Sequence, residues 1–121
     1  MYDENNIFAK ILRGEIPCDK IYEDDNVLFF YDINPLAKIH VLGIPKVKCK
    51  DFSEFVKKTN PEKITNFFKK TEMIINKLEI TDSGYRIISN SGYDGGQEVP
   101  HFHIHILGGE KVTNFFKLDL K

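Results

Sequence analysis

The stretch "HFHIHIL", residues 101–107, alternates histidine with apolar residues, and it constrains the fold more than any other part of the chain. Successive side chains of a β-strand point to opposite faces of its sheet. Three histidines therefore share one face, and the apolar residues share the other, which is the natural core face. The histidines are His101, His103 and His105, and the apolar residues are Phe102, Ile104 and Ile106. Alternate residues lie about 6.5–7 Å apart along a strand, so three imidazoles can line one groove.

The rest of the chain predicts an α+β domain with an antiparallel sheet of about five strands. Runs rich in Ile, Val, Phe and Tyr predict four further strands. These strands cover residues 20–24, 26–33, 39–45 and 84–90. A short helix is predicted within residues 5–17, one or two helical turns over 53–58, and a long helix over 61–78. Antiparallel pairing is expected because three strands follow one another before the long helix.

The long helix has clear start signals and a broad apolar stripe. Asn60 can cap it, and Pro61 suits the first helical position. The stripe consists of Ile64, Phe67, Phe68, Thr71, Ile74, Ile75 and Leu78. It predicts a helix face packed on the core, with a dimer contact as the alternative.

The length of the chain favours one domain, residues 1–121. The opening residues and the cysteine usage favour the cytoplasm. A formal net charge of -1 gives no case for a nucleic-acid or membrane partner. The chain opens with acidic residues rather than a basic leader, and its apolar runs are too short to cross a bilayer. The two cysteines, Cys18 and Cys49, form no C-x-x-C motif and are expected to be free thiols, with a disulfide between them as the alternative.

The histidine cluster allows three interpretations. An imidazole has a pKa near 6.5, so it can act as a base, an acid, a nucleophile or a metal ligand. A solvated polar strand face is the plain alternative. Zinc is the sharper one, because two histidines of an H-x-H pattern can bind zinc and His105 or His40 could add a third ligand. A lone histidine such as His40 is by itself more often structural.

The segment before the histidines favours phosphate as the ligand. In "SNSGYDGGQEVP", residues 89–100, three glycines let backbone N–H groups approach an anion closely. The glycines are Gly92, Gly95 and Gly96, and the neutral donors beside them are Asn90, Ser91 and Gln97. An ordinary turn rich in Gly and Asp is the alternative.

Asp32 ends an apolar strand in "FFYDINP". A single carboxylate in this position can accept two hydrogen bonds from a ribose diol, as the acidic residue of dinucleotide-binding folds does. The alternative is an Asp that opens the following turn.

The motif "HFHIHIL" fits H-φ-H-φ-H-φ-φ, where φ is apolar, and so resembles the histidine triad superfamily. "GYDGGQEVPHFHIHILGG" resembles the branch of histidine triad nucleotide-binding phosphoramidases, known as Hint. "IFAKILRGEIP", "YDINPLAKIHVLGIPK" and "GYRIISNSG" match that branch too. The resemblance covers a core of residues 5 to about 110, followed by a tail over 111–121.

The resemblance implies the HIT fold, as a homodimer with a continuous antiparallel sheet. It implies that a purine nucleotide binds in each groove and that an adenosine or guanosine 5′-phosphoramidate is hydrolysed without a cofactor. His103 would attack the α-phosphorus and form a nucleotidyl-histidine intermediate, from which water releases AMP or GMP. A nucleotide-binding or interaction protein with incidental hydrolysis is the alternative function.

The resemblance also assigns roles to individual residues. His105 would contact the phosphate or the leaving group, and His101 and His40 would complete the hydrogen-bond network. Asp32 would bind the ribose. The other implied nucleotide-binding residues are Phe8, Ile11, Ile33, Asn90, Gly96, Gln97, Glu98 and Val99.

Three departures from the family pattern limit what can be carried over. Glu98 stands where some relatives have a serine near the leaving group, which leaves the preferred amine open. The chain lacks the Trp-Pro-Pro ending of the animal branch. Some bacterial relatives bind structural zinc at positions that are Asn6, Ala9 and Lys48 in this chain, so we expect no metal there.

Overall fold

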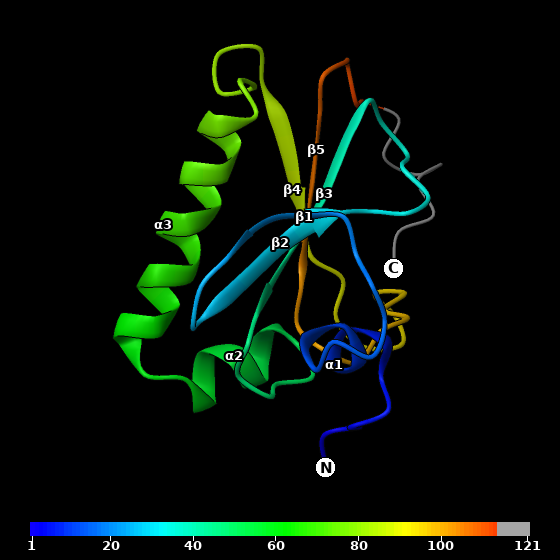
Figure 1. Ribbon diagram of the computed structural model, residues 1–121, viewed down its shortest axis with the longest axis vertical. Helices are drawn as coiled ribbons and strands as arrows, with labels where there is room; N and C mark the ends of the chain where they lie inside the picture. The colour runs from blue at the N-terminus through cyan, green and yellow to red at the C-terminus, as the bar shows by residue number, and fades with distance from the viewer. Residues whose placement is uncertain (114–121) are drawn as a thin grey trace.

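A five-stranded antiparallel sheet organises residues 1–113, the part of the chain that the computed structural model describes (Figure 1). The strands are β1 (Lys20–Glu23), β2 (Val27–Tyr31), β3 (Ile39–Pro45), β4 (Tyr85–Ile88) and β5 (Ile104–Gly108). Their order across the sheet is β1-β2-β3-β5-β4, and all neighbouring pairs are antiparallel. The predicted α+β class with an antiparallel sheet is confirmed.

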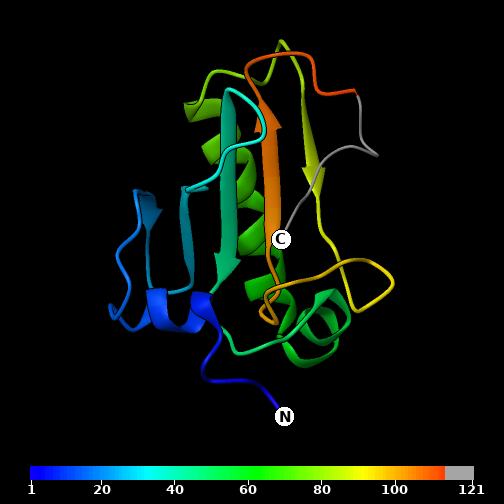
Figure 2. The ribbon, with the colours of Figure 1, turned by 90° about the vertical axis from the view of Figure 1, so that its right-hand side faces the viewer.

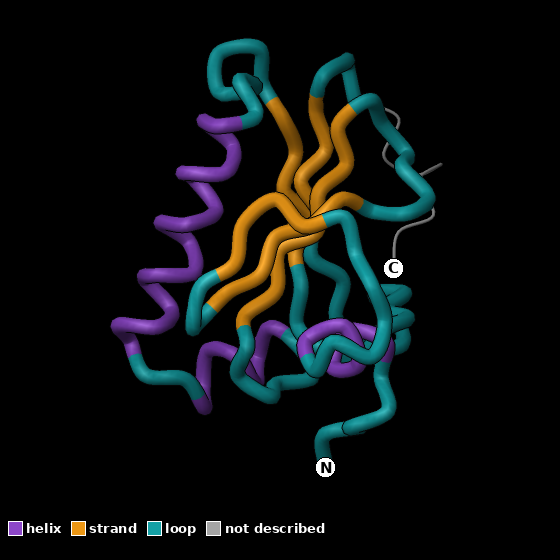
Figure 3. Tube along the Cα trace, viewed as in Figure 1, coloured by secondary structure: helices purple, strands orange, loops and turns teal. Residues whose placement is uncertain are grey.

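Within the described residues, three helices accompany the sheet (Figure 3). They are α1 (Ile7–Leu12), α2 (Phe52–Lys58) and α3 (Pro61–Lys77). The Asn60 side chain accepts a hydrogen bond from the Lys63 N–H and Pro61 is the first helical residue, so both predicted start signals are confirmed. Figure 2 shows α3 running along one face of the sheet, with the short α1 at the end of the sheet nearest the N-terminus.

The main core lies between α3 and this face of the sheet. Phe67 and Ile74 of α3 are fully buried against Phe29 of β2 and against Phe102 and the apolar residues of β5. The predicted stripe is narrower than expected, because Phe68 is 41% exposed on the outer side of the helix. The period of 3.6 residues places Phe68 about 100° around the axis from Phe67, beyond the reach of the sheet.

A second apolar cluster covers the opposite face of the sheet. Phe8 of α1 packs there with Phe30 of β2 and with Leu42 and Ile44 of β3. Val99, from the segment before β5, completes the cluster. The sheet is therefore buried on both faces near β2 and β3. The face covered by α1 is the one that bears the histidine side chains, since Leu42 pairs with His105.

The last strand starts later than the sequence predicted. β5 begins at Ile104, whereas a strand was expected from residue 101. The backbone N–H of Phe102 donates to the carbonyl of Cys49, and that of His101 donates to Val99. These bonds replace strand pairing, since the β3–β5 ladder ends at the pair Gly43–Ile104. The alternation of faces nevertheless continues through the lead-in, because Phe102 still enters the core.

Both cysteines are free thiols, as predicted, so the alternative disulfide is not formed. Cys49 is buried in the main core, where desolvation raises the pKa of its thiol to about 12. No helix within residues 1–113 is long and apolar enough to cross a membrane.

Candidate active site

The four histidines of the chain gather on the α1 side of the sheet. His105 lies in β5 opposite Leu42, and His40 lies in β3 opposite Leu107. Each of the four is at most 2% exposed. The interpretation as a solvated polar face is therefore wrong. Buried imidazoles need hydrogen-bond partners, and those partners determine what each ring can do.

His103 has its tautomer fixed by the main chain. Its Nδ1 lies 2.6 Å from the carbonyl oxygen of His101. A carbonyl oxygen only accepts, so Nδ1 carries the proton and the lone pair of the neutral ring is on Nε2. The ring of Phe8 stands edge-on to it, with centroids 4.8 Å apart. In this tautomer Nε2 is the ring nitrogen of His103 that has the lone pair needed by a nucleophile.

His101 is held neutral by its surroundings. Its Nε2 donates to the carbonyl oxygen of Pro45 at 2.7 Å, and its Nδ1 lies 2.6 Å from the hydroxyl of Tyr2. Burial lowers the pKa of this imidazole to about 4, against the opposing effect of the Pro45 hydrogen bond. His101 therefore supports its neighbours as a neutral ring rather than as a cation.

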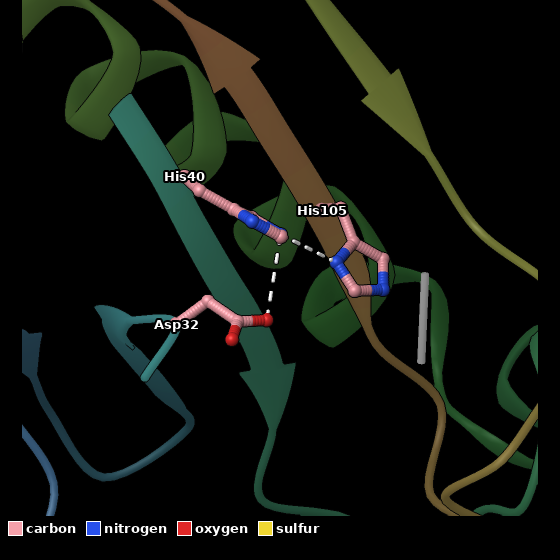
Figure 4. A group of neighbouring side chains, drawn as sticks. All are labelled: Asp32, His40 and His105. Carbon is pink, nitrogen blue, oxygen red and sulfur yellow. Dashed lines mark hydrogen bonds and ion pairs between the residues drawn. The ribbon is translucent and has the colours of Figure 1, made fainter. Parts of the chain in front are cut away.

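His40 and His105 form a chain of hydrogen bonds with Asp32 (Figure 4). The backbone N–H of Leu36 donates to Nδ1 of His40 at 3.1 Å, so a neutral His40 carries its proton on Nε2. That Nε2 lies 2.9 Å from Nδ1 of His105 and 3.4 Å from a carboxylate oxygen of Asp32. His105 accordingly accepts at Nδ1 and presents Nε2–H as a donor.

The same three residues offer ligand atoms within 4.8 Å of one another, so a metal ion must be considered. Two nitrogens bound tetrahedrally to one zinc ion at about 2.0–2.1 Å would lie about 3.3 Å apart. The observed 2.9 Å between the His40 and His105 nitrogens is a hydrogen-bond distance. The arrangement is therefore that of a hydrogen-bonded chain.

Asp32 follows β2 and is only 5% exposed. One carboxylate oxygen accepts from the backbone N–H of Asn34 at 2.8 Å, which is the turn-opening role given as the alternative. Asp32 also lines a cavity whose wall, within the described residues, includes none of the histidines. The cavity adjoins them through Asp32, which contacts His40, and through Phe8, which contacts His103. A carboxylate has about four lone-pair positions, so turn formation leaves acceptor capacity for a ligand.

The cavity has a volume of about 670 Å³, within the range of small-molecule sites. Its lining is mostly apolar, and α1 and β2 supply much of it. Lining residues that the sequence predicted are Phe8, Ile11, Asp32, Ile33 and Val99. The segment 16–19 also lines the cavity and was missed, because nothing in its composition distinguishes it from an ordinary connection.

The glycine-rich segment before β5 is closed by the side chain of Gln97. Its amide group donates to the carbonyl oxygens of Lys50 at 2.7 Å and Val99 at 2.9 Å, and its oxygen accepts from the Gly92 N–H at 3.0 Å. Gly92 and Gly96 have φ angles of 68° and 73°, which favour glycine. Gln97 therefore fastens this loop to the segment before α2.

The remaining predicted loop residues differ in their burial. Asn90 is half-buried, whereas Gly96 and Glu98 are exposed. Ser89, which sequence reasoning did not single out, donates its hydroxyl to the carbonyl oxygen of His103 at 2.8 Å. Both ends of the loop thus contact the backbone around the histidines.

Comparison with known proteins gives the family. Residues 13–112 match the family model described as the HIT domain. The chain belongs to the HIT family. The purine nucleoside phosphoramidase of Escherichia coli (strain K12) is 40% identical over 109 residues, which are 90% of this chain and 91% of that protein. An uncharacterized HIT-like protein of Azospirillum brasilense is 44% identical over 111 residues, or 92% and 91% of the two chains.

Solved structures of HIT proteins share the fold. A histidine triad protein from Clostridium difficile has a TM-score of 0.84 and 40% identity, covering 94% of this chain and 98% of its own. A HIT family hydrolase from Legionella pneumophila also has a TM-score of 0.84, with 37% identity over 91% of this chain and 97% of its own. The family expected from the sequence is therefore confirmed.

Two contacts of this HIT protein come from residues before the matched range. Phe8 packs against the ring of His103, and Tyr2 contacts the ring of His101. The sequence could indicate Phe8, because this residue lies on the apolar face of a predicted helix. Tyr2 had none, because it precedes that helix and belongs to no periodic pattern.

Proposed function

We propose that this HIT protein hydrolyses purine nucleoside 5′-phosphoramidates through a covalent intermediate on His103. The observation that carries the proposal is the 2.6 Å contact between Nδ1 of His103 and the carbonyl oxygen of His101. It places the lone pair on Nε2, as nucleophilic attack requires. The naming of the Escherichia coli relative as a purine nucleoside phosphoramidase supports the choice of substrate.

In the first step, Nε2 of His103 attacks the α-phosphorus and a nitrogen–phosphorus bond forms. The bond from phosphorus to the substrate amine breaks, and its electron pair leaves with the amine nitrogen, which takes up a proton from solvent. The cation that develops on His103 is stabilised because Nδ1–H donates to the His101 carbonyl more strongly as the ring becomes positive. In the second step, water attacks the phosphorus and gives up a proton to solvent, while the bond between phosphorus and Nε2 breaks. Its electron pair returns to Nε2, which restores neutral His103 and releases the nucleoside monophosphate.

His105 serves this reaction as a hydrogen-bond donor. The chain from the Leu36 N–H through His40 leaves the proton of a neutral His105 on Nε2. An N–H group fixed in this way can stabilise charge on a phosphoryl oxygen without reorganising during the reaction. His40 is then a positioning residue, because it sets the tautomer of His105.

The nucleotide would occupy the cavity beside the histidines. The purine fits the apolar part lined by Phe8, Ile11 and Ile33, and the ribose hydroxyls lie at Asp32. Backbone N–H groups of Gln97, His101 and Phe102 already donate within the protein. The N–H of Gly96 also donates within the loop, to the carbonyl oxygen of Tyr93 at 3.0 Å. The phosphate donors are therefore sought at Glu98 and Val99, with Asn90 beside them and Gly96 and Gln97 shaping the loop.

We further propose a homodimer with a continuous sheet. β4 lies at one edge of the sheet and exposes Tyr85 (40%) and Ile87 (46%). A hydrophobic edge strand is a template for pairing with another strand. A second copy of β4 would cover these side chains and extend the sheet across the dimer. Location in the cytoplasm stays a prediction from the sequence.

Single-turnover hydrolysis of an adenosine 5′-phosphoramidate, followed by intact-protein mass spectrometry, tests the reaction. Wild type is expected to form a transient adduct of one nucleotidyl group, unaffected by EDTA. His103→Ala is expected to form none, while its affinity for AMP stays within about tenfold, because binding depends on the cavity and Asp32.

Two results would contradict the proposal. Loss of turnover on chelation would favour a metal-dependent reaction. Tight AMP binding without turnover by wild type would favour the alternative, a nucleotide-binding or interaction protein.

A further inference from the structure

Tyr2 makes a partly buried contact with His101 that has no role in the proposed reaction so far. Its hydroxyl lies 2.6 Å from Nδ1 of His101, and the two rings meet edge-on at 5.6 Å. Because Nε2 of the neutral His101 donates to the Pro45 carbonyl, its Nδ1 can only accept. Tyr2 is therefore the donor, and the two hydrogen bonds fix the ring of His101 from opposite sides.

His101 in turn determines the position of the nucleophile. Its carbonyl oxygen is the acceptor for Nδ1 of His103. The ring and this carbonyl belong to one residue, so hydrogen bonds that hold both ring nitrogens also restrict the position of the His101 Cα, from which the carbonyl extends. A bond made by Tyr2 to the side chain is thereby connected to the orientation of His103.

The segment that carries Tyr2 is anchored to the rest of the protein. The side-chain amide of Asn6 donates to the carbonyl oxygen of Asp3 at 2.7 Å, which closes the turn before α1. Glu4 pairs with Lys48 at 2.8 Å, on the segment after β3, and the Glu4 carbonyl accepts from Arg13 at 2.8 Å. These contacts fix Tyr2 relative to α1 and to β3.

We propose that Tyr2 is a positioning residue for His103, acting through the ring of His101. The expected effect on the reaction rate rests on the proposed function, whereas the expected effect on the orientation of the His101 and His103 rings does not. Tyr2 does not line the nucleotide cavity, so its removal affects the chemical step and leaves nucleotide binding intact.

Tyr2→Phe tests this inference, with Tyr93→Phe as the matched control. Tyr93 is 97% exposed on the loop before the histidines, so the control removes the same hydroxyl where it makes no buried contact. For Tyr2→Phe, the single-turnover rate is expected to fall about tenfold with AMP affinity unchanged. For Tyr93→Phe, both are expected to stay at the wild-type value.

NMR of ¹⁵N-histidine-labelled protein gives a second measurement that needs no substrate. Tyr2→Phe is expected to shift the Nδ1 resonance of His101 and the Nδ1–H resonance of His103. Unchanged resonances would overturn the inference, as would a loss of AMP affinity at an unchanged rate. If wild type has no turnover, the proposed function fails while the NMR comparison still decides the role of Tyr2.

Discussion

At the scale of single residues, the site depends on imidazoles that are buried and still hydrogen-bonded. His101 is the clearest example, because desolvation lowers its pKa to about 4 from an ordinary value of 6.5. A base whose pKa falls on folding is neutral in the folded protein at a pH where the unfolded chain would already be protonated. The stability of the protein therefore depends on pH.

We expect the free energy of unfolding to fall as the pH drops from 6.5 towards 4. Over this interval the unfolded state binds a proton that folded His101 does not, so the unfolded state is favoured. A difference of 2.5 pKa units corresponds to about 3 kcal/mol. The stabilisation is fully present above pH 6.5 and is lost by about pH 4.

Urea unfolding of wild type and His101→Gln between pH 7.5 and 4 measures this contribution. Glutamine can still donate to Pro45 and accept from Tyr2 but does not titrate. Between pH 7.5 and 4, the free energy of unfolding of the variant is expected to fall by about 3 kcal/mol less than that of wild type. Equal losses in the two proteins would show that His101 is not the titrating group.

Asp32→Asn separates binding of the ribose from support of His40. The variant keeps the side-chain volume and an acceptor for the Asn34 N–H, but it loses the charge. If Asp32 binds the ribose, affinity for AMP is expected to fall about tenfold or more, and affinity for 2′-deoxy-AMP much less. Isothermal titration of both nucleotides, with the cavity-lining Asp19→Asn as control, gives the comparison. Equal weakening of both nucleotides would assign Asp32 to the histidines alone.

The sequence could predict which residues meet at the site but not how their hydrogens are arranged. Alternation placed the three histidines on one face, and the structure confirms that placement. The tautomer of His101 depends on the carbonyl of Pro45, 56 positions away in the chain, and that of His40 on the N–H of Leu36, four positions away. No local pattern encodes such partners, because any residue carries the same N–H and C=O groups.

At the scale of helices and strands, the elements were predictable and several of their ends were not. Start signals such as Asn60 and Pro61 act locally, and α3 begins where they indicate. β5 is shorter than its pattern, because Cys49 takes the hydrogen bond of Phe102 that strand pairing would have used. Competition of this kind is decided by tertiary contacts, which periodicity does not contain.

The loop before β5 is a second case in which tertiary contacts decide what the sequence pattern could not predict. Its glycines indicated an unusual backbone, and positive φ angles at Gly92 and Gly96 agree with that prediction. The amide of Gln97 was expected beside the phosphate, yet its hydrogen bonds hold the loop to Lys50 and Val99. Both donors of a side-chain amide are used by these bonds, so Gln97 shapes the loop rather than offering further N–H groups.

At the scale of the whole molecule, the edge of the sheet at β4 is the surface to test. Ile87→Lys is expected to convert the proposed dimer to a monomer, because a charged residue on an edge strand opposes pairing. Tyr93→Lys places the same charge on an exposed loop and is expected to remain dimeric. Analytical ultracentrifugation of the two variants and wild type measures the mass. A wild-type monomer, or a dimer that survives Ile87→Lys, would rule out pairing through this edge.

The strand order also decides when, during synthesis, the protein can become complete. The central strand β3 pairs with β2 as soon as both are made, but its other neighbour is β5, and His40 and His105 are 65 positions apart. Until the last part of the chain leaves the ribosome, the sheet has an open edge in its middle. Most of the cavity wall is made early, from residues before position 43, whereas three of the four histidines arrive late. A growing chain therefore contains most of the residues that line the cavity before it contains three of its four histidines.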